Sequence, residues 1–257
     1  MKKKKNDTSW ENVHSWYKNS VGDKGQHYHQ KVILPRLANC MAKHGVRSLL
    51  DLGCGSGVLE RHLQKGIRYC GVDLSRSLVA EAKKRAKSKE HQFMTADITK
   101  PLTIEADEFD AASIVLALQN LEKPAEAFAN AHQHLGAGGR LYLVINHPCF
   151  RIPRQSFWHL NPEKKSRARC IERYMSSMKI PIKAHPSQGE ESPVTWSFHH
   201  PLSSYFDWLQ QKGFYIESLE EWCSDKQSQG KYAKGENRSR AEIPLFMFIV
   251  ARKGPSK

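Results

Sequence analysis

The stretch Leu49-Leu50-Asp51-Leu52-Gly53-Cys54-Gly55-Ser56-Gly57 decides the fold of this chain. Its first four residues are mostly apolar, as in a strand buried within a sheet, and the glycines that follow have no Cβ atoms. A strand that turns through glycines into the next helix brings bare backbone close to a ligand at the carboxyl edge of a parallel sheet. The stretch therefore predicts a nucleoside-cofactor site at that edge, lined by Gly53, Gly55 and Gly57.

The spacing of the glycines separates two classes of cofactor site. Dinucleotide-binding enzymes carry G-x-G-x-x-G, whereas here the third glycine, Gly57, comes one residue early and Val58 stands in its place. This spacing disfavours a dehydrogenase. Asp73 follows the next apolar run, and an ionised carboxylate at that point accepts hydrogen bonds from ribose hydroxyls in either class.

Short apolar runs alternate with longer amphipathic ones from residue 46 onward, which is typical of βαβ units on a parallel sheet. We expect a Rossmann-like, doubly wound α/β fold with seven strands. The expected strands cover residues 46–52, 67–72, 92–95, 109–116, 140–146, 214–222 and 242–252. The expected helices cover residues 57–65, 75–89, 124–135 and 201–212.

We expect one domain, 1–257, in which two further segments surround a cofactor-binding core. Residues 1–45 carry apolar side chains at helical spacing and predict an N-terminal cap of two helices. Prolines, basic residues and aromatics accumulate between residues 147 and 200, where the periodicity fails. We interpret these residues as an inserted lid that is functional, partly helical around 164–178, or disordered without ligand, and we favour function. The core covers 46–146, and a final helix and strands cover 201–257.

The composition sets limits on partners and location. The 257 residues include 40 Lys+Arg against 26 Asp+Glu, a net charge of +14 that attracts polyanions, unless it is simply a solvated basic surface. The longest apolar run, 111–118, is far shorter than the roughly 18–20 residues that span a bilayer. The basic start at 1–5 continues into polar residues, so we expect no secretion. Six cysteines without a C-x-x-C pair favour reduced thiols in a cytoplasm and no metal site.

Three motifs occur together at the spacing of a known family. They are the glycine stretch at 49–57, Gly71-Val72-Asp73-Leu74-Ser75 and Ala96-Asp97-Ile98. Over about residues 46–146 the chain resembles the class I S-adenosylmethionine-dependent methyltransferases, in their small-molecule branch. Taken separately, the glycines would be turn residues, Asp73 a helix cap and Asp97 a turn acid.

The resemblance implies S-adenosylmethionine as the cofactor and an antiparallel hairpin as the last two strands. It assigns the methionine part of the cofactor to Asp51 and Gly53, and the ribose to Asp73. It assigns adenine, whose amino group needs a carboxylate acceptor, to Asp97 and Ile98. Further expected contacts are Gly55, Gly57, Leu74, Val115 and Tyr28.

Tyr28 and His29 lie in the N-terminal segment that closes over the cofactor in related enzymes, together with Trp16 and Tyr17. We expect these four residues to be lid contacts. Ordinary packing of an amphipathic helix is the alternative.

Methyl transfer from a sulfonium is an in-line displacement, so the protein positions and desolvates the acceptor and, for an oxygen acceptor, removes a proton. No metal is required. His147 follows the fifth expected strand and is the candidate base, the alternative being a residue that bonds to backbone there. His200 or Tyr205, near the start of the late helix, is expected to reach the acceptor, the alternative being helix packing.

Three possibilities remain for the function. The first is an enzyme that methylates an enclosed small molecule at oxygen, nitrogen or carbon, and the aromatic side chains of the insertion favour it. The second is an RNA or protein methyltransferase that holds its substrate with the basic insertion. The third is a cofactor-binding scaffold or regulator without catalysis.

Overall fold

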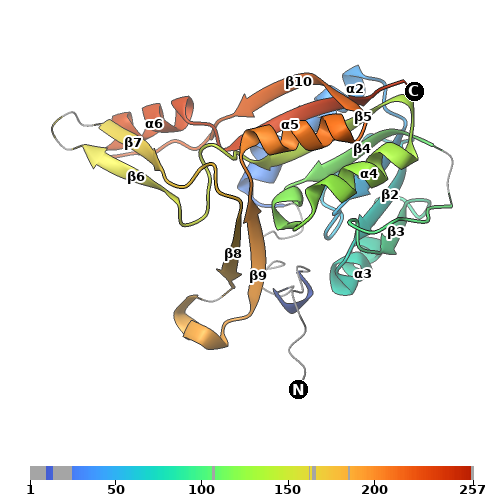
Figure 1. Cartoon of the computed structure of the whole chain (residues 1–257), viewed down its shortest axis with the longest axis horizontal. Helices are drawn as coiled ribbons and strands as arrows, with labels where there is room; N and C mark the ends of the chain where they lie inside the picture. Colours follow the sequence, from blue (N-terminus) through green and yellow to red (C-terminus); the bar gives the residue numbers. More distant parts are fainter. Residues whose placement is uncertain are drawn as a thin grey trace.

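The computed structural model describes residues 10–13, 25–105, 108–161, 163, 166–184 and 186–255. Its centre is a seven-stranded sheet with the order β10-β11-β5-β4-β1-β2-β3 (Figure 1). Neighbouring strands among β1 to β5 run parallel, whereas β11 runs antiparallel to both β5 and β10. This confirms the expected fold class and the antiparallel hairpin. The strands are β1 (Ser48–Leu52), β2 (Arg68–Asp73), β3 (Gln92–Thr95), β4 (Phe109–Val115), β5 (Leu135–Asn146), β10 (Phe214–Trp222) and β11 (Phe246–Lys253).

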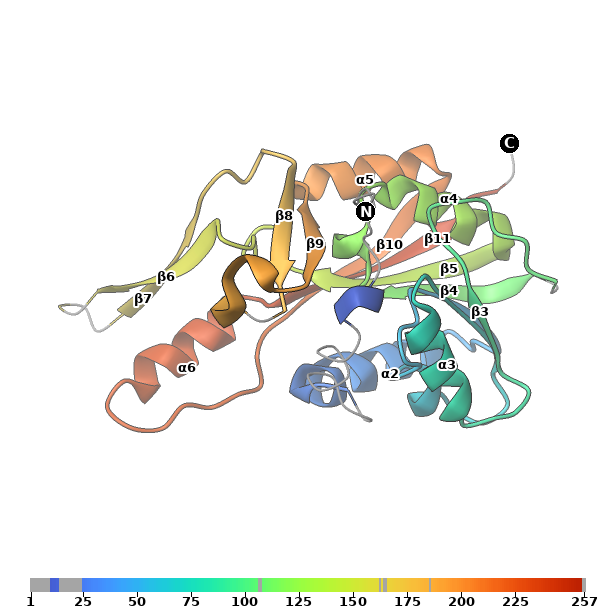
Figure 2. The same cartoon turned by 90° about the horizontal axis from the view of Figure 1, so that it is seen from below.

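Helices cover both faces of the sheet (Figure 2). α4 (Pro124–His134) and α5 (Leu202–Gln211) lie on one face, and α2 (Leu34–Lys43) and α3 (Arg76–Lys84) lie on the other. Each face has its own buried apolar cluster against the helices. The central strand β1 is buried along its whole length, which explains why its sequence is a continuous run rather than an alternation.

The prediction of a helix at 57–65 is wrong. The structure has only a 3-10 turn there, η3 (Glu60–His62). Gly57 has a φ of +75°, and Leu63, which ends the turn, is extended. The backbone therefore leaves the helical region on both sides of η3, and this crossing from β1 to β2 is mostly loop.

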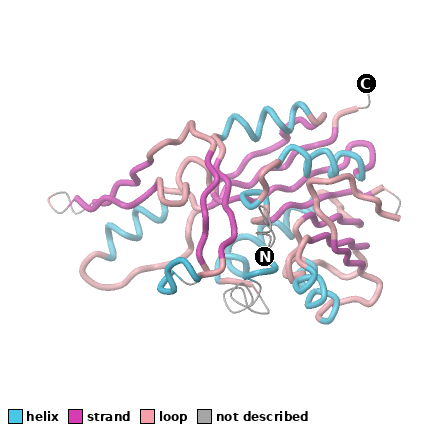
Figure 3. Tube along the Cα trace, turned by 60° about the horizontal axis from the view of Figure 1, so that its bottom comes forward, coloured by secondary structure: helices cyan, strands magenta, loops and turns pink. Residues whose placement is uncertain are grey.

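The insertion forms two antiparallel hairpins beyond the carboxyl ends of β4 and β5, as Figures 2 and 3 show. The alternative that the insertion is partly helical around 164–178 is therefore wrong. The hairpin strands are β6 (Ser156–Asn161) with β7 (Ser166–Ile171), and β8 (Met178–Lys183) with β9 (Val194–His199).

Side-chain contacts across the first hairpin explain the strand structure. The guanidinium groups of Arg167 and Arg169 on β7 lie 5.5 Å and 5.3 Å from the ring centre of Trp158 on β6. Residues two apart point to the same face of a strand but not of a helix. Both arginines therefore meet one aromatic ring only in the extended conformation.

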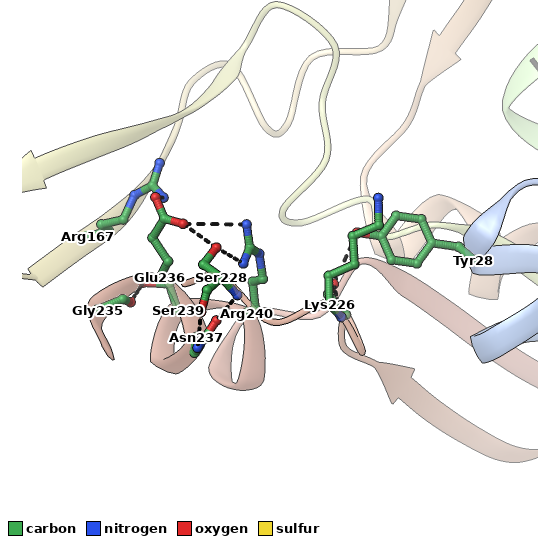
Figure 4. Close-up of polar contacts among 10 residues, drawn as sticks. Tyr28, Arg167, Lys226, Ser228, Gly235, Glu236, Asn237, Ser239 and Arg240 are labelled. Carbon is green, nitrogen blue, oxygen red and sulfur yellow. Dashed lines mark hydrogen bonds and ion pairs between the residues drawn. The ribbon is translucent and has the colours of Figure 1, made fainter. Parts of the chain in front are cut away.

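The sequence also failed to predict α6 (Ala233–Glu242), which lies between β10 and β11. The helix is polar on nearly all sides, so hydrophobic periodicity gives no signal for it. It packs beside β7 through Glu236, which accepts a hydrogen bond from Arg167 at 2.9 Å (Figure 4). Arg240 and Glu236 both contact the hydroxyl of Ser228 in the loop before the helix.

The N-terminal cap is described in part. A 3-10 turn, η1 (Glu11–Val13), precedes a π-helix, η2 (His29–Ile33), that continues into α2. Trp16, Tyr17 and the basic start at 1–5 lie outside the described residues. Within the described ranges, no helix is both long and apolar enough to cross a membrane.

Candidate cofactor site and active site

The loop after β1 requires glycine at its first and last glycine positions. Gly53, Gly55 and Gly57 have φ of +83°, +54° and +75°, a region that L side chains rarely adopt. A Cβ atom on Gly53 would lie 2.5 Å from the Cβ of Ala117, and one on Gly57 would lie 3.2 Å from the Cβ of Ala82 on α3. The glycines therefore let the loop pass closely between the end of β4 and α3.

Asp73 ends β2 and holds the glycine loop from the side. Its Oδ2 accepts a hydrogen bond from the backbone N–H of Gly55, and its Oδ1 accepts one from the N–H of Ser75, each at 2.9 Å. Burial raises the pKa of Asp73, and the bonds from these N–H groups oppose that effect. Each carboxylate oxygen has two acceptor positions, so the group retains capacity for ribose hydroxyls.

Asp73 is not the cap of the helix that follows. The N-cap of α3 is Ser75, whose hydroxyl accepts a hydrogen bond from the N–H of Leu78 at 3.2 Å. Leu74, between them, leaves 41% of its surface exposed beside the polar site. An apolar side chain placed there is suited to cover one face of a planar base.

Asp97 and Ile98 follow β3 at the same edge of the sheet. Oδ1 of Asp97 accepts hydrogen bonds from the backbone N–H and the hydroxyl of Thr99, at 2.9 Å and 2.7 Å, whereas no described residue donates to its Oδ2. Ile98 is buried, and its Cδ1 would lie 3.9 Å from a Cβ on Gly53. These contacts join the second and third motifs to the glycine loop.

Asp51 lies below the loop, in the interior of the sheet. Its carboxylate accepts hydrogen bonds from the hydroxyls of Tyr69 on β2 and Ser113 on β4, each at 2.8 Å. Only 2% of Asp51 is exposed, and burial raises its pKa to about 6. The carboxylate thus ties β1 to both neighbouring strands, and a ligand meets the loop above it first.

The chain is strained immediately after Val115, which is half-buried at the end of β4. Leu116 has a φ of +51°, which costs a branched residue roughly 1–2 kcal/mol. The turn η4 (Leu118–Asn120) follows, and the side-chain amide N–H of Gln119 donates to the carbonyl of Leu116 at 2.7 Å. Sequence reasoning missed Gln119, because neither the strain nor the turn leaves a pattern in the sequence.

β9 packs beside both η4 and η1, and it places polar side chains there. Thr195, Ser197 and His199 alternate along the strand and are all buried. The hydroxyl of Thr195 and the Oε1 of Gln119 are buried without a hydrogen-bond partner among the described residues. Such atoms are rare in folded proteins, and a bound water or a polar group of a ligand would satisfy them.

His147 follows β5 but is fully engaged within the protein. Its Nδ1 accepts the backbone N–H of Cys149 at 3.2 Å, so its Nε2 carries the proton and donates to Glu221 at 2.6 Å. Only 2% of the side chain is exposed, and burial lowers its pKa against the opposing effect of Glu221. Both ring nitrogens of His147 therefore contact the protein's own groups, which hold the end of β5 to β10.

His200 and Tyr205 lie together at the start of α5. Tyr205 is buried in the apolar cluster below α5, and burial raises its pKa. Nδ1 of His200 lies 3.1 Å from the hydroxyl of Ser177, and its Nε2 is buried without a partner among the described residues. His200 thus has a nitrogen still available, whereas Tyr205 is part of the core.

Tyr28 connects the N-terminal segment to the loop after β10. Its hydroxyl lies 3.1 Å from that of Ser224, and the ammonium of Lys226 lies 5.1 Å from its ring centre (Figure 4). His27 contacts Asp225 at 2.9 Å in the same loop. Tyr28 therefore connects two segments that are distant in the sequence, and its role as a lid contact stays a prediction.

Two other N-terminal residues contact the site region. Glu11 accepts hydrogen bonds from the hydroxyls of Ser75 and Ser77 at the start of α3, at 2.5 Å and 2.6 Å. His29 lies in the π-helix with its Nδ1 buried and without a partner among the described residues, and burial lowers its pKa to about 4. The N-terminal segment thus covers the loop region from the α3 side.

Residues 50–143 match a family model described as a methyltransferase domain. A ubiquinone biosynthesis O-methyltransferase from Coxiella burnetii (strain Dugway 5J108-111) is 32% identical over 101 residues, which are 37% of this chain and 42% of that protein. The chain spans about half the length, or less, of the curated relatives it matches.

Solved structures extend the likeness beyond the core. A crystal structure of an S-adenosylmethionine-dependent methyltransferase from Mesorhizobium loti is 28% identical, has a TM-score of 0.61, and is matched over 80% of this chain and 90% of its own. One from Clostridium acetobutylicum, 17% identical with a TM-score of 0.59, shares the fold over 95% of this chain and 98% of its own. Together with the three motifs and the strand order, the match over residues 50–143 identifies a methyltransferase domain in this chain, and the solved structures show that the chain has the fold of S-adenosylmethionine-dependent methyltransferases.

Proposed function

We propose that this protein transfers the methyl group of S-adenosylmethionine to a small-molecule acceptor. The observation that carries the proposal is the arrangement at the carboxyl edge of the sheet. There, the glycine loop, Asp73 and Asp97 follow the neighbouring strands β1, β2 and β3, and β9 and the N-terminal turn η1 pack nearby. This arrangement supports a site for a nucleoside ligand at that edge.

The residues at this edge fit the cofactor. In our proposal the methionine part lies against the glycine loop above the buried Asp51, and Asp73 accepts hydrogen bonds from the ribose hydroxyls. The open Oδ2 of Asp97 accepts from the adenine amino group, while the exposed Leu74 covers the base. The bound cofactor supplies an electrophilic methyl group on a sulfonium.

The protein's own residues hold the acceptor and exclude water from it. The unpartnered hydroxyl of Thr195 and the unpartnered carbonyl of Gln119 lie on two elements in contact, β9 and η4. In our proposal they bond to polar groups of the acceptor at the end of β4. Positioning of this kind accounts for much of the acceleration of an in-line displacement.

His200 is the histidine that we propose to act near the acceptor, through its buried and unpartnered Nε2. His147 acts as a positioning residue, because both its nitrogens are engaged. Tyr205 supports His200 by packing, with the two ring centres 6.3 Å apart. Burial lowers the pKa of His200, which keeps its imidazole neutral and able to accept a proton at neutral pH.

Two observations favour a small molecule over RNA or protein as the acceptor. The N-terminal segment, β9 and the loop after β10 come from distant parts of the sequence and close on one another, as in the contact of Tyr28 with Ser224. The Coxiella relative is named for ubiquinone biosynthesis, which is small-molecule chemistry. The basic insertion is the feature that favours RNA or protein.

Calorimetry with S-adenosylhomocysteine tests the cofactor site. Asp73→Asn should weaken binding about tenfold or more, because a hydrogen bond to a charged group contributes ~1.5–3 kcal/mol. Asp110→Asn is the matched control, since Asp110 also accepts two backbone N–H bonds but at the opposite end of the sheet. Equal losses in both variants would remove the cofactor role of Asp73.

Transfer of a labelled methyl group from S-adenosylmethionine tests the acceptor class. The purified protein is incubated with small-molecule, RNA and protein fractions of a cell extract, one at a time. We expect label in the small-molecule fraction, with a rate that falls in Thr195→Val. Label in RNA or protein alone contradicts the small-molecule proposal, and cofactor binding without transfer to any fraction favours a scaffold or regulator.

A further inference from the structure

A pocket lies in the insertion, away from the glycine loop. It has a volume of about 380 Å³, which lies at the lower end of the roughly 300–1,000 Å³ typical of small-molecule sites. The turn before β6, the turn before β8, and β8 itself form its walls. Its polar lining residues are Arg154, Gln155, Arg173, Ser177 and Lys179.

The charge in this pocket is positive and largely uncompensated. No acidic side chain of the described residues lines it. The nearest ion pair joins Lys179 to Glu122 at 4.0 Å, and Glu122 is 54% exposed, so water screens this contact. The three cations of the lining therefore repel one another when no anion is present.

Contacts with neutral groups hold two of the cations in place. Arg154 donates from Nη2 to the backbone carbonyl of Pro181 at 3.0 Å. The ammonium of Lys179 lies 4.7 Å from the ring centre of Trp196 and 5.6 Å from that of Phe198. These contacts orient the side chains without neutralising them, as in a preformed anion site.

Both arginines also have a strained backbone. Arg154 has a φ of +62° and Arg173 a φ of +52°, and of the described residues that are not glycine only Leu116 shares this conformation. Leu116 lies in the candidate active site. A non-glycine residue in this region is costly, and such strain is concentrated at functional sites.

From this combination of cavity, charge and strain, we propose that the pocket binds a phosphate group. Arginine forks match the oxygens of a phosphate, and Lys179 adds a point charge to the same pocket. The hydroxyl of Ser177 and the amide of Gln155 supply neutral donors. The phosphate comes from a small phosphorylated molecule or from a nucleic-acid backbone, and the site accounts for part of the basic character of the insertion.

Calorimetry with inorganic phosphate tests the site in the full-length protein. We expect one binding event, and we expect Arg173→Asn to weaken it about tenfold or more, since the lost hydrogen bonds are charge-assisted. Asparagine tolerates the left-handed backbone, so this variant should unfold at no lower temperature than the wild type. A loss of binding with stability retained therefore cannot come from misfolding.

The matched control is Lys89→Gln, which removes one positive charge from an exposed position outside the pocket. It should leave phosphate affinity unchanged. Equal weakening by Lys89→Gln and Arg173→Asn would show a general charge effect and would overturn the proposal. Absence of any phosphate binding to the wild type would overturn it too.

Two further probes distinguish the sources of the phosphate. Glycerol phosphate should bind at least as tightly as inorganic phosphate if the natural ligand is a small molecule. A single-stranded oligonucleotide without terminal phosphates should bind more tightly than either, with a steep dependence on salt, if the ligand is a nucleic acid. In both cases Arg173→Asn must weaken the binding, and unchanged binding of both probes to this variant refutes the site. S-adenosylhomocysteine binding is measured in parallel, because it tests the cofactor site independently.

Discussion

Replacing Gly53 by alanine tests the close approach on which the cofactor site depends. Gly53 has a φ of +83°, and a Cβ atom there would lie 2.5 Å from the Cβ of Ala117. The left-handed backbone costs an L residue ~1–2 kcal/mol, and overpacking costs a further ~1–3 kcal/mol. We therefore expect Gly53→Ala to lower the free energy of unfolding by ~2–5 kcal/mol.

Gly66→Ala separates the two contributions. Gly66 has nearly the same φ, +86°, but no heavy atom lies within 4 Å of its would-be Cβ. It should therefore show only the backbone cost of ~1–2 kcal/mol. The free energies are measured by urea unfolding, and calorimetry with S-adenosylhomocysteine should show a loss of cofactor affinity in Gly53→Ala only.

The double variant Gly53→Ala/Ala117→Gly removes the clash and should recover much of the excess loss. If Gly53→Ala is no less stable than Gly66→Ala, the end of β4 does not lie against the glycine loop. The glycine loop would then lack the close packing on which the proposed cofactor site depends.

Three further predictions concern titratable residues of the site. Burial raises the pKa of Asp51 from 3.8 to about 6, so between these pH values the folded protein binds a proton that the unfolded protein does not. The free energy of unfolding therefore falls as pH rises across that interval. Urea unfolding of Asp51→Asn should lack this fall, which amounts to ~3 kcal/mol, and an unchanged pH dependence would contradict the burial of the charge. The pKa of His29 is lowered to about 4, so in an NMR titration its imidazole should stay neutral down to about that pH. The free energy of unfolding should fall as pH drops from 6.5 toward 4. A titration midpoint near 6.5 would show that the ring is exposed. His147→Ala should lower the rate of methyl transfer while cofactor affinity stays nearly constant, and full activity would remove its positioning role.

Local sequence patterns were sufficient for the elements that depend on local chemistry. The apolar run of β1 and the glycines after it predicted a buried strand and a bare loop, because burial on both faces and left-handed backbone each demand particular residue types. β3 was predicted at its observed bounds, and the strand order and antiparallel end followed from the family resemblance. The assigned roles of Asp73 and Asp97 stay predictions until a ligand is bound.

The insertion shows where local patterns fail. Its residues predicted an inserted lid, with partial helix around 164–178 as one alternative, but Trp158 stacks with two arginines of a partner strand. Such cross-strand contacts leave no local pattern in the sequence. The polar helix α6 is held by Arg167 of β7, far away in sequence, rather than by an apolar face of its own. Non-local contacts of this kind override weak local preferences.

The sequence by itself predicted the fold class and the three motifs, because these rest on residue types at fixed short spacings. Only the tertiary structure decided what each candidate side chain is free to do. It engaged both nitrogens of His147, buried Tyr205 in the core, and left Gln119 and Thr195 unpartnered on facing elements. Hydrogen-bond partners come from segments far apart in the chain, so only folding determines which polar atoms remain available for chemistry.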